Sequence, residues 1–168
     1  MSGTVYWITG LSGAGKSTVG KILYDKIKSE KDNVVLLDGD ALRLAIASDL
    51  GYTEEGRHES ARRNVGLCNL LGNQGIDAIC CTICMFEDIR EWSREHNEKY
   101  VEVYLKVPMD VLRSRNQKNL YVEAEDELVG LGVGMEEPQH PDLVVINDGS
   151  KTPEEIADMI LDVGRSLE

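Results

Sequence analysis

The sequence predicts one α/β domain in three layers, with a five-stranded parallel sheet between helices. Apolar runs rich in β-branched residues alternate along the chain with longer segments of helical periodicity. The runs lack the polar alternation of a strand that faces water, which indicates strands buried on both faces. The length of 168 residues suits a single domain over residues 1–168 that folds unaided.

The expected elements follow one another in a regular order. Five apolar runs are the expected strands, and helical segments lie between them and after the last one. The last helix has a clear start, because Thr152 is a capping residue, Pro153 suits the first helical position and two glutamates follow. The expected strands span residues 5–9, 33–37, 76–83, 100–105 and 142–147, and the expected helices span residues 16–30, 54–71, 86–98, 109–116 and 153–167.

Residues 116–141 interrupt this alternation. The segment carries many charges and three glycines, and it contains no clear strand. A connection of this length inside a compact domain usually has a function. We interpret it as a lid over a binding site.

The net charge of −12, from 30 acidic and 18 basic residues, argues against a broad nucleic-acid surface. An anionic ligand would therefore need a local basic pocket. No apolar run approaches the ~18 residues of a membrane span, and the start of the chain does not resemble a signal peptide. We therefore expect a cytoplasmic protein that contacts neither nucleic acid nor membrane.

The four cysteines are Cys68, Cys80, Cys81 and Cys84, and the last two form a Cys-x-x-Cys pair. This pair lies in an apolar run, where an extended strand would point Cys81 and Cys84 to opposite faces. A second cysteine pair and a histidine at zinc-ligand spacing are missing from the sequence. Core packing is favoured over a metal site or a disulfide.

A glycine-rich stretch, "ITGLSGAGKST", follows the first expected strand and has the pattern Gly-x-x-x-x-Gly-Lys-Ser. Its glycines let successive backbone N–H groups converge on phosphate oxygens, and the next helix directs its positive end there. The lysine would neutralise the β- and γ-phosphates, while the serine can ligate Mg²⁺. The expected ATP-binding residues of this loop are Gly10, Ser12, Gly13, Ala14, Gly15, Lys16, Ser17 and Thr18.

Two carboxylates follow the second expected strand, in the stretch "LLDGDALR". Asp38 and Asp40 would lie at the carboxyl edge of the sheet beside the phosphate loop. One can support Mg²⁺ while the other accepts a proton from an attacking hydroxyl, which favours phosphoryl transfer to an alcohol. The alternative is an ordinary turn followed by a helix cap.

Four arginines come next, namely Arg43, Arg57, Arg62 and Arg63. Guanidinium groups bind phosphate or sulfate through two hydrogen bonds, so these residues are candidates for a second anionic ligand. For Arg62 and Arg63, ion pairs with glutamates on an exposed helix are an equally good interpretation.

Nearly the whole chain resembles the adenylylsulfate kinase family. The similar stretches, in order, are "GLSGAGKST", "LLDGDALR", "GRHESARRN", "KNLY" and "EEPQHPDLVVIND". The resemblance implies a three-layer P-loop nucleotide-kinase fold. It also implies that MgATP phosphorylates the ribose 3′-hydroxyl of adenosine 5′-phosphosulfate to give 3′-phosphoadenylylsulfate.

The resemblance also implies roles for individual residues. Asp40 becomes the catalytic base, with Lys16 and Asp38 as the other catalytic groups, and Ser17 and Asp38 form the metal site. Arg115 joins the ATP-binding residues and acts at the lid. The implied substrate-binding residues are Asp38, Arg43, Tyr52, Arg57, Ser60, Ile83, Cys84, Lys118, Leu120 and Leu128.

The differences from the family fall on the substrate side. Ser60 stands where the family has a substrate-binding asparagine, and Cys84 follows Ile83 in place of a serine. Two aromatic rings sandwich the adenine in the family, whereas Tyr52 is the first of these positions here and Leu128 the second. The residues that face ATP match the family.

The sequence therefore predicts an ATP-dependent kinase that phosphorylates a ribose 3′-hydroxyl of a nucleotide conjugate, with adenosine 5′-phosphosulfate as the first candidate. An alternative acceptor is a cytidine diphosphate derivative such as cytidine diphosphoramidate, used in surface polysaccharide modification. A regulatory module that binds ATP without turnover is a third interpretation, against which the retained catalytic residues argue. The expected cofactors are ATP and Mg²⁺, the expected partner is a small nucleotide, and a homodimer stays open.

Overall fold

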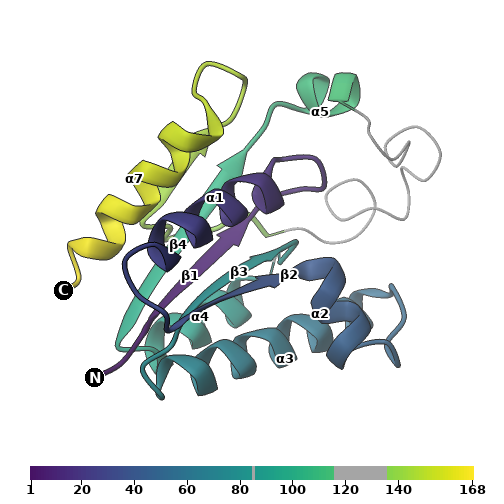
Figure 1. Cartoon of the computed structure of the whole chain (residues 1–168). Coiled ribbons are helices and arrows are strands. Elements are labelled where there is room, and N and C mark those ends of the chain that lie inside the picture. Colours follow the sequence, from purple (N-terminus) through teal and green to yellow (C-terminus); the bar gives the residue numbers. More distant parts are fainter. Residues whose placement is uncertain (85, 116–135) are drawn as a thin grey trace.

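The computed structural model describes residues 1–84, 86–115 and 136–168 (Figure 1). In this part of the chain, five strands pair in parallel in the order β2-β3-β1-β4-β5. The predicted three-layer α/β fold is confirmed. The strands are β1 (Thr4–Thr9), β2 (Val34–Asp38), β3 (Asp77–Thr82), β4 (Lys99–Lys106) and β5 (Leu143–Ile146).

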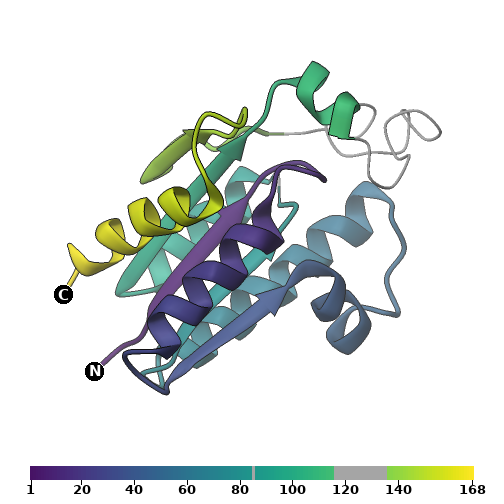
Figure 2. The same ribbon diagram turned by 45° about the horizontal axis from the view of Figure 1, so that its top comes forward.

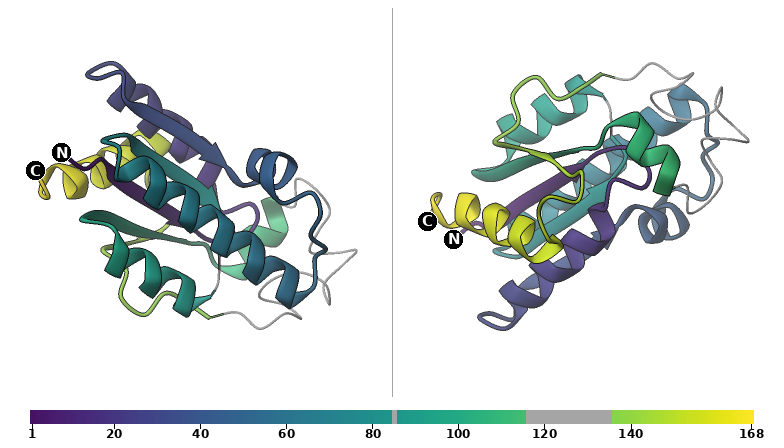
Figure 3. Two further views of the ribbon diagram at one scale, coloured as in Figure 1. Left: turned by 90° about the horizontal axis from the view of Figure 1, so that it is seen from below. Right: turned by 90° about the horizontal axis from the view of Figure 1, so that it is seen from above.

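Helices cover both faces of the sheet, as Figure 3 shows from opposite sides. Helices α1 (Lys16–Lys28) and α7 (Pro153–Arg165) lie side by side on one face. Helices α3 (Glu54–Gly72) and α4 (Glu87–His96) lie side by side on the other. The short helices α2 (Gly39–Ile46) and α5 (Met109–Arg115) lie near the carboxyl ends of the strands (Figure 2).

Helix α2 was not among the expected helices, although the alternative interpretation of the residues after the second strand was a turn followed by a helix cap. The helix begins directly after β2, so Asp38 is both the last residue of the strand and the N-cap of α2. Residues 42–46 are mostly apolar, but Leu42 alone among the residues of α2 is buried. A helix of 8 residues with one buried side chain leaves little periodicity to detect.

The sheet separates two hydrophobic cores, because side chains of successive strand residues point to opposite faces. In the central strand β1, Tyr6 and Ile8 belong to the core under α1 and α7. Val5 and Trp7 belong to the core under α3 and α4. All four are buried, which explains why this strand is apolar throughout.

The cysteines divide between the two cores and are all free and buried. Cys81 lies in the core under α1, whereas Cys68, Cys80 and Cys84 lie in the core under α3 and α4. Burial raises the pKa of Cys81 and of Cys84 to about 12, so both thiols stay protonated near neutral pH. Neutral buried thiols pack as small apolar side chains.

Both chain ends lie at the edge of the sheet opposite α2 and α5 (Figure 1). Residues 116–135 of the expected lid lie outside the described residues, and residues 136–141 return to β5. None of the described helices is both long enough and apolar enough to cross a membrane.

Gly20→Ala is expected to destabilise the domain, because a Cβ atom at position 20 would overlap the Sγ atom of Cys81. Crowding a packed core costs about 1–3 kcal/mol, which outweighs the roughly 1 kcal/mol that alanine adds to a helix. Gly66→Ala in α3 is the matched control, because no atom lies within 4 Å of a Cβ atom there. Urea unfolding should show a loss of stability for the first variant and a small gain for the second. Equal stability of Gly20→Ala and wild type would contradict the close packing of α1 on β3.

Candidate active site

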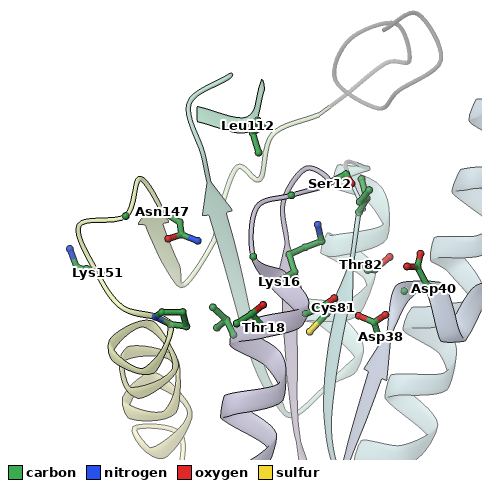
Figure 4. A pocket seen from close by; sticks show the side chains of 18 of the residues that line it. Ser12, Lys16, Thr18, Asp38, Asp40, Cys81, Thr82, Leu112, Asn147 and Lys151 are labelled. Atoms are coloured by element: carbon green, nitrogen blue, oxygen red, sulfur yellow. Dashed lines mark hydrogen bonds between the residues drawn. The ribbon is translucent and has the colours of Figure 1, made fainter. Parts of the chain in front are cut away.

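A cavity of about 740 Å³ lies along the carboxyl edge of the sheet (Figure 4). It extends from the end of β2, which contributes Asp38, to the loop after β5, which contributes Asn147. These two strands are the opposite edges of the sheet, and β1 with its glycine-rich loop lies between them. Figure 4 shows the side chain of Lys16 between the two carboxylates on one side and Asn147 and Lys151 on the other.

The glycine-rich loop joins β1 to α1 and forms the centre of the cavity. Gly13 and Gly15 have φ values of 84° and 93°, a left-handed conformation that glycine adopts without strain. The Nζ atom of Lys16 donates to the carbonyl of Leu11 at 2.8 Å, which holds the ammonium group over the loop. Of the eight predicted loop residues, Gly10 and Ala14 are buried beneath the cavity, and the others line it.

The two residues predicted to hold Mg²⁺ are in direct contact. The hydroxyl of Ser17 donates to Oδ1 of Asp38 at 2.5 Å. Asp38 occupies the N-cap of α2 without capping it, so its carboxylate is directed to the phosphate loop. Two hard oxygen ligands beside a phosphate-binding loop suit Mg²⁺, which prefers oxygen and keeps part of its water shell.

Asp40 lines the same cavity from the first turn of α2. Its side chain is exposed, so it can reach a bound ligand. An acid in the first turn of a helix is stabilised by the helix dipole, which explains how a short helix tolerates it there. Helix α2 thus places the predicted base next to the predicted metal ligands.

Two of the predicted substrate arginines share one aromatic ring. The guanidinium carbons of Arg43 and Arg57 lie 4.4 and 5.6 Å from the ring centre of Tyr52. Arg43 also donates to the carbonyls of Leu50 and Gly51, and Arg57 donates to that of Tyr52. Burial, followed by the charge of Arg43, lowers the pKa of Arg57. Two cations this close to one another form a local binding place for an anion, which would relieve their repulsion.

Arg62 and Arg63 form ion pairs on a helix, which was the second interpretation of these two residues from the sequence. Arg62 donates to both carboxylate oxygens of Glu59 at 2.7 Å. Arg63 pairs with Asp49 at 2.7 Å and with Glu59 at 3.3 Å. These pairs engage both guanidinium groups at the surface of α3.

The remaining predicted substrate residues lie in different environments. Ser60 is half-buried on α3, and Ile83 lines the cavity after the end of β3. The side chain of Cys84 is fully buried in the core under α3 and α4, so its position does not direct the thiol into the cavity. Three predicted positions, Lys118, Leu120 and Leu128, lie outside the described residues, and so does the side chain of Arg115 at the end of α5.

Sequence reasoning missed the far end of the cavity. The side-chain amide of Asn147 donates to the carbonyl of Ala14 at 2.8 Å, which attaches the loop after β5 to the phosphate loop. Lys151 and Leu112 also line the cavity. A signal was present, since Asn147 is the last residue of an expected strand and carboxyl ends of parallel strands share one edge.

Relatives with known names match nearly the full length of the chain. A cytidine diphosphoramidate kinase from Campylobacter jejuni is 35% identical over 161 residues, which is 94% of both chains. An adenylyl-sulfate kinase from Halothermothrix orenii is 37% identical over 164 residues, covering 95% of this chain and 88% of the relative. The Mycobacterium tuberculosis APS kinase CysC, solved in complex with AMPPNP and APS, has a TM-score of 0.88 at 28% identity, covering 96% of this chain and 97% of the other.

The family described as adenylylsulphate kinase has a sequence model that matches residues 2–146. This range includes the phosphate loop, both aspartates and the shared arginine site. The match argues against the third interpretation of the sequence, a regulatory module that binds ATP without turnover, because the named relatives are kinases. The chain belongs to the adenylylsulfate kinase family, and it is an ATP-dependent kinase with a hydroxyl group as acceptor.

Proposed function

We propose that this kinase transfers the γ-phosphoryl group of ATP to the ribose 3′-hydroxyl of a nucleotide with an anionic 5′-substituent. Adenosine 5′-phosphosulfate is the first candidate acceptor. The observation that carries the proposal is the Ser17–Asp38 contact in one cavity with Lys16 and Asp40. The solved Mycobacterium tuberculosis relative, with AMPPNP and APS in its complex, supports this choice of donor and acceptor.

Four residues of the cavity would act in the reaction, namely Lys16, Ser17, Asp38 and Asp40. The acceptor oxygen attacks the γ-phosphorus, the bond to the bridging oxygen of the β-phosphate breaks, and ADP leaves. Asp40 takes the proton that the hydroxyl gives up. Lys16 stabilises the charge that moves onto the leaving phosphate. Ser17 and Asp38 would hold Mg²⁺, directly or through water, and the ion would offset phosphate charge.

The arginine site supports an acceptor with a charged 5′-substituent. Arg43 and Arg57 present two guanidinium groups around Tyr52, in a chain of net charge −12. A neutral nucleoside would leave their repulsion in place, whereas a phosphate, phosphosulfate or phosphoramidate group would compensate it. A cytoplasmic location and a homodimer stay predictions.

A cytidine diphosphate conjugate is the second candidate acceptor. The Campylobacter jejuni relative, which is named for cytidine diphosphoramidate, matches 94% of this chain. The sequence differences at Ser60 and Leu128 fall where the family contacts the acceptor, and they leave the ATP side unchanged. A smaller pyrimidine base is compatible with an aliphatic side chain in place of one stacking ring.

Lys16→Ala should abolish transfer while the fold stays intact, because the variant loses the cation that follows charge between the phosphates. Groups of this kind are worth about 3 kcal/mol or more in the transition state, which corresponds to at least about 100-fold in kcat/KM. Lys21→Ala is the control, because Lys21 lies on the same helix in an exposed ion pair with Asp25. ADP release should be measured in a coupled assay. Activity of Lys16→Ala within threefold of wild type would refute the assignment of the phosphate loop.

Asp40→Asn should lower kcat by about two orders of magnitude with little change in ATP affinity, because an amide keeps the shape but takes no proton. Asp38→Asn should instead raise the Mg²⁺ concentration needed for half-maximal rate, since it weakens an oxygen ligand. Magnesium titrations at saturating ATP separate the two effects. The opposite pattern in the two variants would reverse the assigned roles.

Leu128→Phe should raise kcat/KM for adenosine 5′-phosphosulfate by about tenfold, because stacking of a base on an aromatic ring is worth ~1–3 kcal/mol. Leu131→Phe is the control for a nearby leucine of the same segment. The assay compares adenosine 5′-phosphosulfate with cytidine and uridine diphosphate conjugates and with plain nucleosides. We expect charged 5′-conjugates to be phosphorylated and nucleosides to be ignored. If adenosine 5′-phosphosulfate is best by a hundredfold and Leu128→Phe changes nothing, the stacking argument is wrong.

A further inference from the structure

Arg90 is a fully buried cation outside the cavity, on α4. Its guanidinium donates in three directions. Nε and Nη2 donate to Oε2 of Glu87 at 3.1 and 2.6 Å. Nη1 donates to the carbonyl of Cys84 at 2.6 Å, and Nη2 donates to the carbonyl of Glu136 at 2.7 Å. Arg90 therefore joins the start of its own helix, the end of the β3 segment and residue 136 on the return to β5.

The carbonyl of Cys84 accepts a second hydrogen bond, from β1. The hydroxyl of Thr9 donates to it at 3.0 Å, and the Cys84 amide donates to the same hydroxyl oxygen at 3.3 Å. Thr9 is fully buried and ends β1, so the next residue is Gly10 of the phosphate loop. One peptide group thus connects the strand that leads to the phosphate loop with the buried arginine.

The position of Cys84 matters because its neighbour Ile83 lines the cavity. The paired register of β1 and β3 ends at Thr9 and Thr82, so the sheet does not hold the next two residues. Ile83 packs against Tyr104, and Leu11 of the phosphate loop packs against the same tyrosine. Asp38 and Asp40 line the same cavity, so a displacement of Ile83 changes the wall beside the reacting groups.

We propose that Arg90 is a positioning residue for the acceptor, acting through the Cys84 carbonyl on the wall formed by Ile83. The inference rests on the proposed function, because it takes the acceptor to lie against Ile83. An arginine suits the role because its planar group donates in several fixed directions at once. A lysine at this position is a point charge, and it cannot reproduce the same set of hydrogen bonds to Glu87, Cys84 and Glu136.

Arg90→Lys tests the proposal through two Michaelis constants measured in one assay. The KM for the acceptor should rise about tenfold, because the Cys84 carbonyl loses a charge-assisted hydrogen bond, while the KM for ATP stays within about twofold. Arg94→Lys is the matched control. Arg94 lies one turn further along α4, and its guanidinium donates to the carbonyl of His140 and to Asp142 instead of to Cys84. It should leave both constants within about twofold of wild type.

Thr9→Val and Thr9→Ser provide a second pair in case Arg90→Lys does not fold. Valine keeps the shape of threonine but removes the hydroxyl that bonds both backbone atoms of Cys84, so the acceptor KM should rise. Serine keeps the hydroxyl, so the acceptor KM of Thr9→Ser should stay near the wild-type value. An unchanged acceptor KM in Arg90→Lys and Thr9→Val, or an equal rise for acceptor and ATP, would overturn the proposal.

Amide hydrogen exchange separates a failure of this inference from a failure of the proposed function. The Cys84 amide should exchange several-fold faster in Arg90→Lys and Thr9→Val than in Arg94→Lys, with ATP bound in each case. If the wild type phosphorylates none of the acceptors offered, the proposed function fails, and faster exchange still supports positioning by Arg90. Unchanged exchange at Cys84 overturns the positioning role whatever the acceptor is.

Discussion

All five described strands run in the same direction, so each strand delivers the loop after it to the same edge of the sheet. This constraint brings together residues that are far apart in the sequence. Ser17 forms a hydrogen bond with Asp38, which lies 21 residues further along the sequence, and Asn147 forms one with Ala14, 133 residues away. An antiparallel arrangement would alternate the loops between two edges and would separate these groups. The cavity is therefore a direct result of strand direction.

The central place of β1 adds a second constraint. This strand pairs with both β3 and β4, and it leads directly to the phosphate loop. Its side chains fill both cores, which makes the base of the loop rigid. Rigid support reduces the reorganisation needed when charge moves during phosphoryl transfer. The described groups that we propose to contact an acceptor lie instead on α2 and α3, between these helices and on the segment after β3.

The net negative charge of the chain repels anionic nucleotides, and a few cationic side chains at the cavity and around Tyr52 offset this repulsion locally. A net charge of −12 repels nucleotides at long range, although salt screens much of that effect. Lys16 and the two arginines around Tyr52 concentrate positive charge where phosphate or sulfate would lie. Binding of an anionic nucleotide would therefore depend on short-range, directed hydrogen bonds.

The sequence predicted most of the fold, because buried parallel strands are continuous apolar runs and the glycine-rich loop has a fixed pattern. It also predicted that Asp38 and Asp40 would lie beside that loop. It did not predict α2, which is only 8 residues long and buries a single side chain. Nor could it separate Arg90 from Arg94, which lie four residues apart in one helix, since burial depends on packing that the local sequence does not encode. Asn147 was missed because its partner is near the other end of the chain.

Both chain ends lie at the edge of the sheet remote from the cavity (Figure 1). An affinity tag, a fluorescent protein or a surface linker attached to either end would start on the side of the sheet away from the described cavity. The same geometry would let a second catalytic domain be joined at either end on the side of the sheet away from this cavity. The architecture is thus well suited to gene fusion and to immobilisation in a flow reactor.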